Sequence, residues 1–176
     1  MLYFIRHGQT DANVQRLYAG SEWDVPLNDT GRAQARKFAL ANRDLLRQID
    51  KFYVSPMIRT RETATIIAET AMLDVPFEMA EHLREWDVGE WSRKPYDEVG
   101  KILETLATPP GGESFAVFSA RALGALRHAA TQENERALVV AHGGIWRCYA
   151  HYANHSLHDI DNCAHMELCR VTLQNS

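Results

Sequence analysis

Three polar clusters in this sequence combine residue types that suit the binding of an anion. Arg6-His7-Gly8 follows an apolar run, and its glycine would let the backbone approach a ligand closely. His142-Gly143-Gly144 follows the most apolar stretch of the chain, where the histidine could act as a further positive donor. Each tripeptide is a weak motif by itself, so a surface or structural role remains the alternative for each histidine.

The third cluster places a cation at the expected start of a helix. Ser55 suits the N-cap and Pro56 suits the first helical position, which puts Arg59 in the first turn. The helix dipole disfavours a cation there, and a bound anion would reverse that effect. Arginine also suits two-pronged contacts with phosphate. The alternative is that Arg59 and Arg61 are solvated surface residues.

A carboxyl group with apolar and aromatic neighbours is suited to proton donation. Glu85 lies in such a surrounding, between Leu83 and Trp86. The same segment also contains Asp87 and Glu90, so nothing local distinguishes Glu85 from them.

The elements that must position these residues alternate along the chain. The pattern predicts strands at residues 2–5, 51–55, 75–80, 137–141 and 166–173, and helices at 29–49, 55–72, 96–106, 113–132 and 145–154. This alternation predicts an α/β fold with three layers, in which helices cover both faces of a mostly parallel sheet. All three clusters follow strands or strand ends, and ligands bind there in such sheets.

Composition indicates one globular domain spanning residues 1–176. The chain is 45% hydrophobic and 24% charged, with a net charge of −4 and a pI near 6.0. This balance argues against nucleic-acid and membrane partners. The apolar N-terminal run is too short for a signal peptide, and we therefore expect a cytoplasmic location. Nothing in the sequence indicates an oligomeric state.

We expect neither a metal nor another cofactor. His151, His155 and His158 have ligand-like spacing, with Asp159 and Asp161 nearby. Histidines at helical spacing on a polar face are more often solvated, and that interpretation is favoured here.

Taken together, the motifs resemble those of the histidine phosphatase superfamily, which has the phosphoglycerate mutase-like fold. The resemblance runs from about residue 2 to 173 and is closest to the small phosphatase branch. The matching motifs, in family order, are Arg6-His7-Gly8, Pro26-Leu27, Gly31, Gln34-Ala35, Ser55 to Arg59 with Glu62-Thr63-Ala64, Leu83 to Gly89, Gly111-Gly112-Glu113-Ser114 and His142-Gly143-Gly144. In this family, a lid-like insertion would occupy about residues 86–112.

The resemblance implies a role for each matching residue. His7 would accept the phosphoryl group, Glu85 would donate a proton, and Arg6, Arg59 and a protonated His142 would complete the phosphate pocket. Further positions that match phosphate-contacting or pocket-lining residues are Asn13, Gln9, Thr10, Gly20 and Gly143.

The implied activity is metal-independent hydrolysis of phosphomonoesters through a phosphohistidine. A phosphoglycerate mutase-type transfer and a non-catalytic phospho-ligand binder are the alternatives. The stretch at 109–114 is similar to one in α-ribazole phosphatases and in broad-specificity sugar-phosphate phosphatases, which suggests a small phosphorylated metabolite such as α-ribazole 5'-phosphate or a sugar phosphate as substrate. Two departures leave the leaving-group preference open. Trp91-Ser92-Arg93 stands where many relatives have Trp-Glu-Gly, and Ala19-Gly20 stands where many have Gln-Gly.

Overall fold

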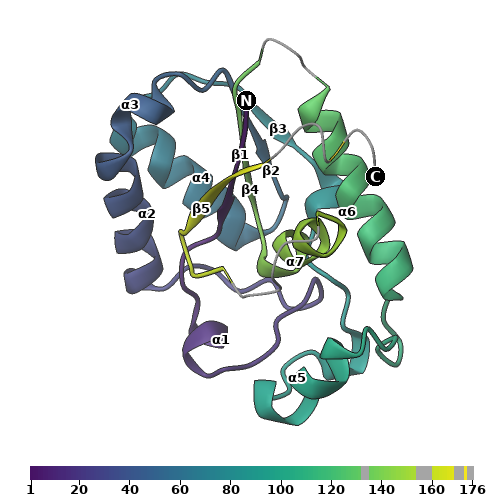
Figure 1. Cartoon of the computed structure of the whole chain (residues 1–176). Coiled ribbons are helices and arrows are strands. Elements are labelled where there is room, and N and C mark those ends of the chain that lie inside the picture. The colour runs from purple at the N-terminus through teal and green to yellow at the C-terminus, as the bar shows by residue number, and fades with distance from the viewer. Residues whose placement is uncertain (132–134, 154–159, 169–172, 174–176) are drawn as a thin grey trace.

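The computed structural model describes residues 1–131, 135–153, 160–168 and 173, and its centre is a mostly parallel β-sheet (Figure 1). In this described part, the strands are β1 (Leu2–Arg6), β2 (Lys51–Val54), β3 (Phe77–Met79), β4 (Ala137–Ala141) and β5 (His165–Leu168). Their order across the sheet is β3-β2-β4-β1-β5. Only β5 runs antiparallel to its neighbour β1 among these strands.

Helices cover both faces of the sheet, which confirms the predicted three-layer α/β fold (Figure 1). One face carries α2 (Asp29–Ala41), α3 (Arg43–Leu46) and α4 (Ile58–Ala71), and the other carries α6 (Phe115–Ala130) and α7 (Gly143–Tyr152). The elements beyond the sheet are α1 (Asp11–Val14), α5 (Tyr96–Glu104) and the two 3₁₀ turns η1 (Glu81–Leu83) and η2 (Gly89–Trp91).

The apolar sequence of the central strand β4 follows from its place in the sheet. Successive side chains of a strand point to opposite faces of the sheet. Ala137, Val139 and Ala141 belong to the core beneath α6 and α7, and Leu138 and Val140 belong to the core beneath α2 and α4. Because helices cover both faces, every residue of β4 is buried.

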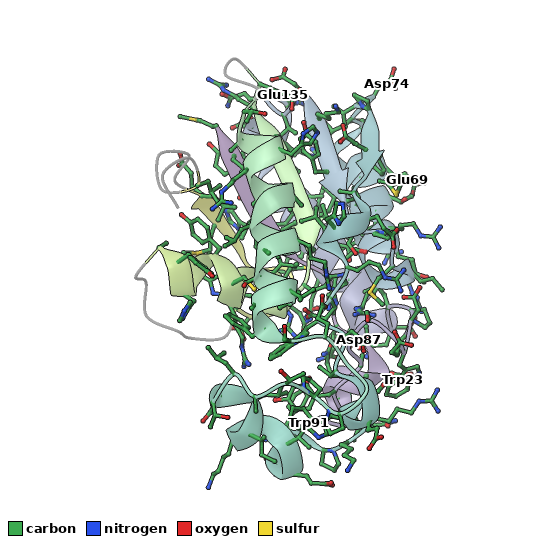
Figure 2. The ribbon with its side chains drawn as sticks, turned by 90° about the vertical axis from the view of Figure 1, so that its right-hand side faces the viewer. Trp23, Glu69, Asp74, Asp87, Trp91 and Glu135 are labelled. Carbon is green, nitrogen blue, oxygen red and sulfur yellow. The ribbon has the colours of Figure 1, made fainter. Side chains whose placement is uncertain are left out.

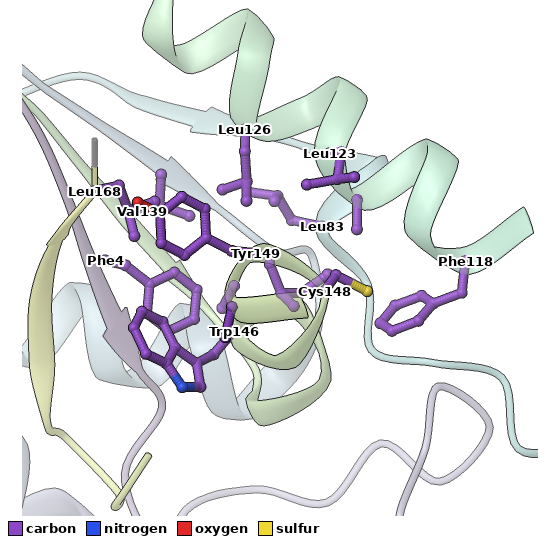
Figure 3. Packing of buried hydrophobic residues seen from close by; sticks show 14 of the residues in the cluster. Phe4, Leu83, Phe118, Leu123, Leu126, Val139, Trp146, Cys148, Tyr149 and Leu168 are labelled. Atoms are coloured by element: carbon purple, nitrogen blue, oxygen red, sulfur yellow. The ribbon is translucent and has the colours of Figure 1, made fainter. Parts of the chain in front are cut away.

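Aromatic side chains fill the core on the α6 and α7 face (Figure 3). The Phe4 ring from β1 lies 6.1 Å from the Trp146 ring of α7, and Trp146 in turn lies 5.7 Å from Tyr149. Leu126 of α6 is fully buried in the same cluster. This packing holds α7, and with it His142, against the sheet.

Several element boundaries differ from those predicted, most clearly at the ends of three elements. The helix predicted over 29–49 is broken at Asn42, whose φ of −118° is not helical and whose side chain donates to the carbonyl of Phe38. Helix α4 begins at Ile58 because Ser55 continues the sheet, donating its N–H to the Val140 carbonyl. The last strand begins at His165, and the predicted residues 169–172 lie outside the described part of the chain.

The end of the molecule beyond the carboxyl ends of the parallel strands carries α1 and α5 (Figure 1). Figure 2 shows Trp23, Asp87 and Trp91 at this end and Glu135 at the opposite one. Residues 16–18 pair with residues 93–96: the Tyr18 N–H donates to Lys94, and the Tyr96 N–H donates to Arg16. These bonds tie α5 to the segment that follows α1.

No helix in the described residues has both the length and the apolar character that a bilayer crossing requires.

The first turn of α2 lies in backbone contact with residues 8 and 9. A Cβ added at Gly31 would lie 2.1 Å from the Gln9 carbonyl oxygen, and one added at Gly8 would lie 2.5 Å from the Gly31 carbonyl oxygen. Glycine at these positions is therefore what allows the loop after His7 to pack on α2.

We expect Gly31→Ala to lower the free energy of unfolding by about 1–3 kcal/mol, because the added methyl group overlaps backbone that cannot move aside. Gly124→Ala is the matched control, since Gly124 is also helical and a Cβ there meets nothing within 4 Å. Alanine at Gly124 should stabilise by about 0.5–1 kcal/mol through helix propensity. Urea unfolding measures both changes, and equal effects at the two sites would contradict the packing argument.

Candidate active site

The topology brings His7 and His142 side by side. They follow β1 and β4, which are neighbours paired in register, and the His7 N–H donates to the Ala141 carbonyl at 3.0 Å. The chain continues from β1 to helices on one face and from β4 to α7 on the other (Figure 1). This is the switch point at which ligands bind in such sheets. The two imidazole rings lie 5.3 Å apart, edge to face.

The hydrogen bond of His7 determines which ring nitrogen is free. Its Nδ1 lies 2.7 Å from the Gly8 carbonyl oxygen, which can only accept, so Nδ1 carries the hydrogen. Burial lowers the pKa of His7 well below its usual value, and the nearby Arg59 and Arg6 cations lower this pKa further. The ring is therefore neutral, with a lone pair on Nε2, as a nucleophile requires.

The His142 ring is neutral as well, with both nitrogens engaged. Its Nδ1 accepts from Arg59 Nε at 3.3 Å, and its Nε2 lies 2.8 Å from Ser55 Oγ. A guanidinium only donates, so the ring hydrogen is on Nε2 and points to Ser55. Burial and the Arg59 cation lower the pKa of His142 well below its usual value. The expectation of a protonated His142 therefore differs from the structure, in which this fully buried ring orients Arg59.

Arg59 is buried and held by main-chain acceptors. Its Nη2 donates to Gly20 O at 3.0 Å, and its Nη1 donates to Trp23 O at 3.4 Å. Burial lowers the pKa of Arg59 to about 10, against the opposing influence of Glu85 and Asp24, so the side chain remains charged at neutral pH. These two hydrogen bonds use one hydrogen on each Nη, and the guanidinium lines a cavity, where its remaining hydrogens could bind phosphate.

Asp24 supports Arg59 and was not predicted from the sequence. Its two carboxylate oxygens lie 2.9 and 3.1 Å from the Ile58 N–H, and Oδ1 lies 3.7 Å from Arg59 Nη1. Asp24 thus caps α4 in place of Ser55 and puts a negative charge at the positive end of that helix. The only local signal was an acidic residue in a loop, which indicates no partner.

Arg6 and Asn13 line a cavity together with His7 and Arg59. Arg6 Nη1 donates to the Ile160 carbonyl at 2.7 Å, whereas its Nε is buried with no hydrogen-bond partner among the described residues. The Asn13 oxygen accepts from the N–H and hydroxyl groups of Thr10, which leaves the Asn13 amide hydrogens for another acceptor. An unsatisfied buried donor is costly, and an anion in the cavity would relieve that cost.

Glu85 lines the same cavity. Its Oε1 accepts from the Trp86 N–H at 2.9 Å, and its Oε2 accepts from the Gly144 N–H at 3.1 Å. A Cβ added at Gly144 would lie 2.1 Å from Glu85 Oε1. The second glycine after His142 is therefore the residue that admits this carboxylate to the N-terminus of α7.

A cavity of about 710 Å³ lies at this switch point. Eight of the ten residues predicted for the site line it: Arg6, His7, Thr10, Asn13, Gly20, Arg59, Glu85 and Gly143. His142 does not line it, and neither does Gln9, whose side-chain oxygen accepts from Asn28 on the α2 side at 3.2 Å. Residues of α5, including Tyr96 and Lys101, form the outer wall.

Comparison with known proteins decides the family. Residues 2–175 match the profile of the histidine phosphatase superfamily, branch 1. The chain is a member of this superfamily. The resemblance predicted from the ordered motifs is thereby confirmed.

The relatives of this histidine phosphatase superfamily member are named for different activities. It is 31% identical over 157 residues to adenosylcobalamin/alpha-ribazole phosphatase of Salmonella typhimurium, a match that covers 82% of this chain and 74% of that protein. It is 35% identical over 157 residues to agropine synthesis reductase of Rhizobium rhizogenes, covering 84% of this chain but only 34% of that protein. The chain thus spans about a third of the length of the latter.

A solved structure shares the fold. A mycobacterial glucosyl-3-phosphoglycerate phosphatase, described as a complex with VO3, superposes with a TM-score of 0.76 at 26% identity. The match covers 93% of this chain and 90% of that chain.

The two departures from the family motifs touch each other in this superfamily member. Ser92 Oγ donates to the Ala19 carbonyl at 3.3 Å, and Ala19 lines the cavity. Arg93 does not line it, and its guanidinium lies 4.9 Å from the centre of the Trp23 ring. The hydrogen bond between Ser92 and Ala19 therefore joins the end of η2 to the cavity wall.

Within the described ranges, no group of three or more His, Cys, Asp or Glu side chains is arranged to hold a metal ion. Of the residues noted for their ligand-like spacing, His155, His158 and Asp159 lie outside those ranges.

We expect the stability of the protein to fall below pH 6.5 because two imidazoles are buried in the neutral form. Folding holds the pKa of His7 and of His142 below 6.5, so unfolding takes up protons at lower pH. Stability is fully present above pH 6.5 and declines below it by about 1.4 kcal/mol per pH unit for each histidine, down to its folded pKa. The comparison is denaturant unfolding of the wild type and the His7→Gln/His142→Gln variant from pH 5 to 8. The two curves should diverge below pH 6.5, and parallel curves would contradict the assignment.

Proposed function

We propose that this protein is a phosphomonoester hydrolase that passes the phosphoryl group through a covalent phosphohistidine on His7. One observation carries the proposal: His7 is held neutral with Nε2 available, at the wall of a cavity that also contains Arg6, Arg59 and Glu85. A neutral nucleophile, two cations and a carboxyl group are the parts that phosphoryl transfer to histidine requires.

In the first step, His7 Nε2 attacks phosphorus in line with the bond to the leaving oxygen. The Nε2–P bond forms as the P–O bond of the ester breaks. The equatorial oxygens carry the negative charge, and the free donors of Arg6, Arg59 and Asn13 bind them. Glu85, entering this step as an acid, gives its proton to the leaving alkoxide, and the alcohol departs.

In the second step, water completes the hydrolysis. Glu85, now a carboxylate, takes a proton from the attacking water while the oxygen bonds to phosphorus. The N–P bond breaks, and its electron pair returns to His7 Nε2. Inorganic phosphate leaves, and both residues are restored to their starting states.

The cavity volume supports a small phosphorylated metabolite as the substrate. A volume of about 710 Å³ exceeds what a phosphate group needs and lies in the usual range for small-molecule sites. The Salmonella relative's name and the 109–114 stretch make α-ribazole 5'-phosphate the first candidate, with sugar phosphates next.

A phosphate-release screen over sugar phosphates, nucleotides, phosphoglycerates and α-ribazole 5'-phosphate tests the proposal. Release of inorganic phosphate from at least one of these supports hydrolysis. Analysis of the organic product, with and without a bisphosphate primer, detects transfer to a second hydroxyl. Transfer without net phosphate release would replace hydrolysis by mutase chemistry, and no turnover at all would overturn the proposal.

His7→Ala should abolish both turnover and formation of the phosphoenzyme, because the alanine side chain has no atom that can attack phosphorus. Rapid quenching of a single turnover, followed by intact-protein mass spectrometry, detects the phosphorylated chain. His128→Ala is the control, since His128 is exposed on α6 and does not line the cavity. A phosphoenzyme that survives in His7→Ala would mean that another residue accepts the group.

Glu85→Gln should lower kcat by about 10²–10⁴-fold while the protein stays folded, because the amide cannot transfer a proton but its oxygen can still accept from Gly144. Steady-state kinetics and thermal unfolding measure the two effects. Glu90→Gln is the matched control, since Glu90 is an exposed carboxylate nearby that does not line the cavity. Full activity in Glu85→Gln would refute this role.

A further inference from the structure

Arg121 divides its hydrogen bonds between the segment that carries Glu85 and the carboxylate of Glu113. From helix α6, its Nη1 donates to the carbonyls of His82 at 3.0 Å and Arg84 at 2.7 Å, and its Nη2 donates to the carbonyl of Glu85 at 2.9 Å. The remaining two N–H groups pair with Glu113, at 2.9 Å from Nε and 2.6 Å from Nη2. A guanidinium has five N–H groups, and all five are engaged.

Glu113 holds the same segment on the other side of Glu85. Its Oε2 accepts from the Asp87 N–H at 3.1 Å, and its own N–H donates to the Asp87 carbonyl at 3.1 Å. Its carbonyl accepts from Trp86 Nε1 at 2.8 Å. The Arg121–Glu113 pair is mostly buried, with side-chain exposures of 20% and 15%. The pair is thus largely shielded from solvent, and its two parallel N–H···O bonds give the two-pronged geometry of a strong ion pair.

The Glu85 segment has no regular structure that could hold it in place. Residues 85–88 belong to no helix or strand. In place of helix or sheet hydrogen bonds, those from the Arg121–Glu113 pair hold the backbone on both sides of Glu85. Besides the adjacent Trp86 N–H, the carboxylate itself has only the Gly144 N–H as a partner among the described residues.

The sequence around Glu113 is shaped for this contact. A Cβ added at Gly112 would lie 2.5 Å from the Asp87 carbonyl oxygen, so glycine permits the close approach. Ser114 caps α6 by accepting from the Val117 N–H. The Gly112-Glu113-Ser114 motif thus starts α6 and delivers a carboxylate to Arg121.

We propose that the Arg121–Glu113 pair positions Glu85 for proton donation to the leaving group. This role rests on the proposed phosphatase function. Neither Arg121 nor Glu113 lines the cavity, so both act through Glu85 and are positioning residues. A small displacement of a catalytic group can cost about 10²-fold in rate.

The test compares two esters that differ in their need for an acid. The leaving group of glycerol phosphate is a strongly basic alkoxide, whereas that of p-nitrophenyl phosphate is a stable phenolate that needs little protonation. Arg121→Met should lower kcat/KM for glycerol phosphate by about 10–100-fold and that for p-nitrophenyl phosphate by less than about 3-fold. Arg127→Met on the same helix is the matched control, since Arg127 contacts the Leu173 carbonyl and should leave the ratio of the two values unchanged.

A double-mutant cycle shows whether Arg121 acts through Glu85. In a Glu85→Gln background, Arg121→Met should change kcat/KM for glycerol phosphate by less than about 2-fold, because the proton donor is already gone. Thermal unfolding verifies that each variant is folded at the assay temperature. Should Arg121→Met fail to fold, Glu113→Gln, which breaks the charged pair but keeps its shape, takes its place in both comparisons.

Each outcome separates the two claims. Equal losses with both esters, or a full additional loss in the Glu85→Gln background, would overturn the positioning role and leave the phosphatase function standing. A wild-type protein that hydrolyses neither ester nor any substrate of the phosphate-release screen would overturn the function, and the positioning role with it.

Discussion

The burial of the Arg59 guanidinium is the constraint on which the rest of the site depends. Moving a cation out of water costs several kcal/mol unless its N–H groups find acceptors. Here the acceptors are the carbonyls of Gly20 and Trp23 and the Nδ1 atom of His142. The His142 ring must therefore stay neutral, and the loop at 20–24 must fold over the start of α4, where Asp24 caps the helix.

The same positive surroundings prepare the nucleophile. Arg59 and Arg6 disfavour a charged imidazole at His7, and the Gly8 carbonyl selects the tautomer with Nε2 free. An anion drawn to these cations meets an uncharged nucleophile instead of a competing cation. In the same cavity, the Glu85 carboxylate lies at the N-terminus of α7 because Gly144 leaves room for it. Different residues thus determine the charge of His7, its tautomer and the space for Glu85.

Much of the fold could be predicted because buried strands have a simple sequence signature. The runs at 2–5 and 137–141 are apolar throughout, as a strand covered on both faces must be, and both form interior strands of the sheet. The start of α4 was predicted too early, because the preference of Ser55 for capping is local whereas Asp24 competes for that position from a distant loop. Gln9 was placed in the cavity by its motif, yet its side chain turns to Asn28.

The sequence by itself determined which chemical groups are present, in what order, and on which kinds of element. That was enough to identify the family and to place eight of the ten predicted residues at the cavity, but not to find the residues of α5 that form its outer wall. Only the tertiary structure decided the protonation of His142, the support of Arg59 by Asp24 and the bracing of the Glu85 segment by Arg121. The physical reason is that residue type and periodicity report local preference and burial, whereas the state of a buried polar group depends on partners that the fold brings from elsewhere in the chain.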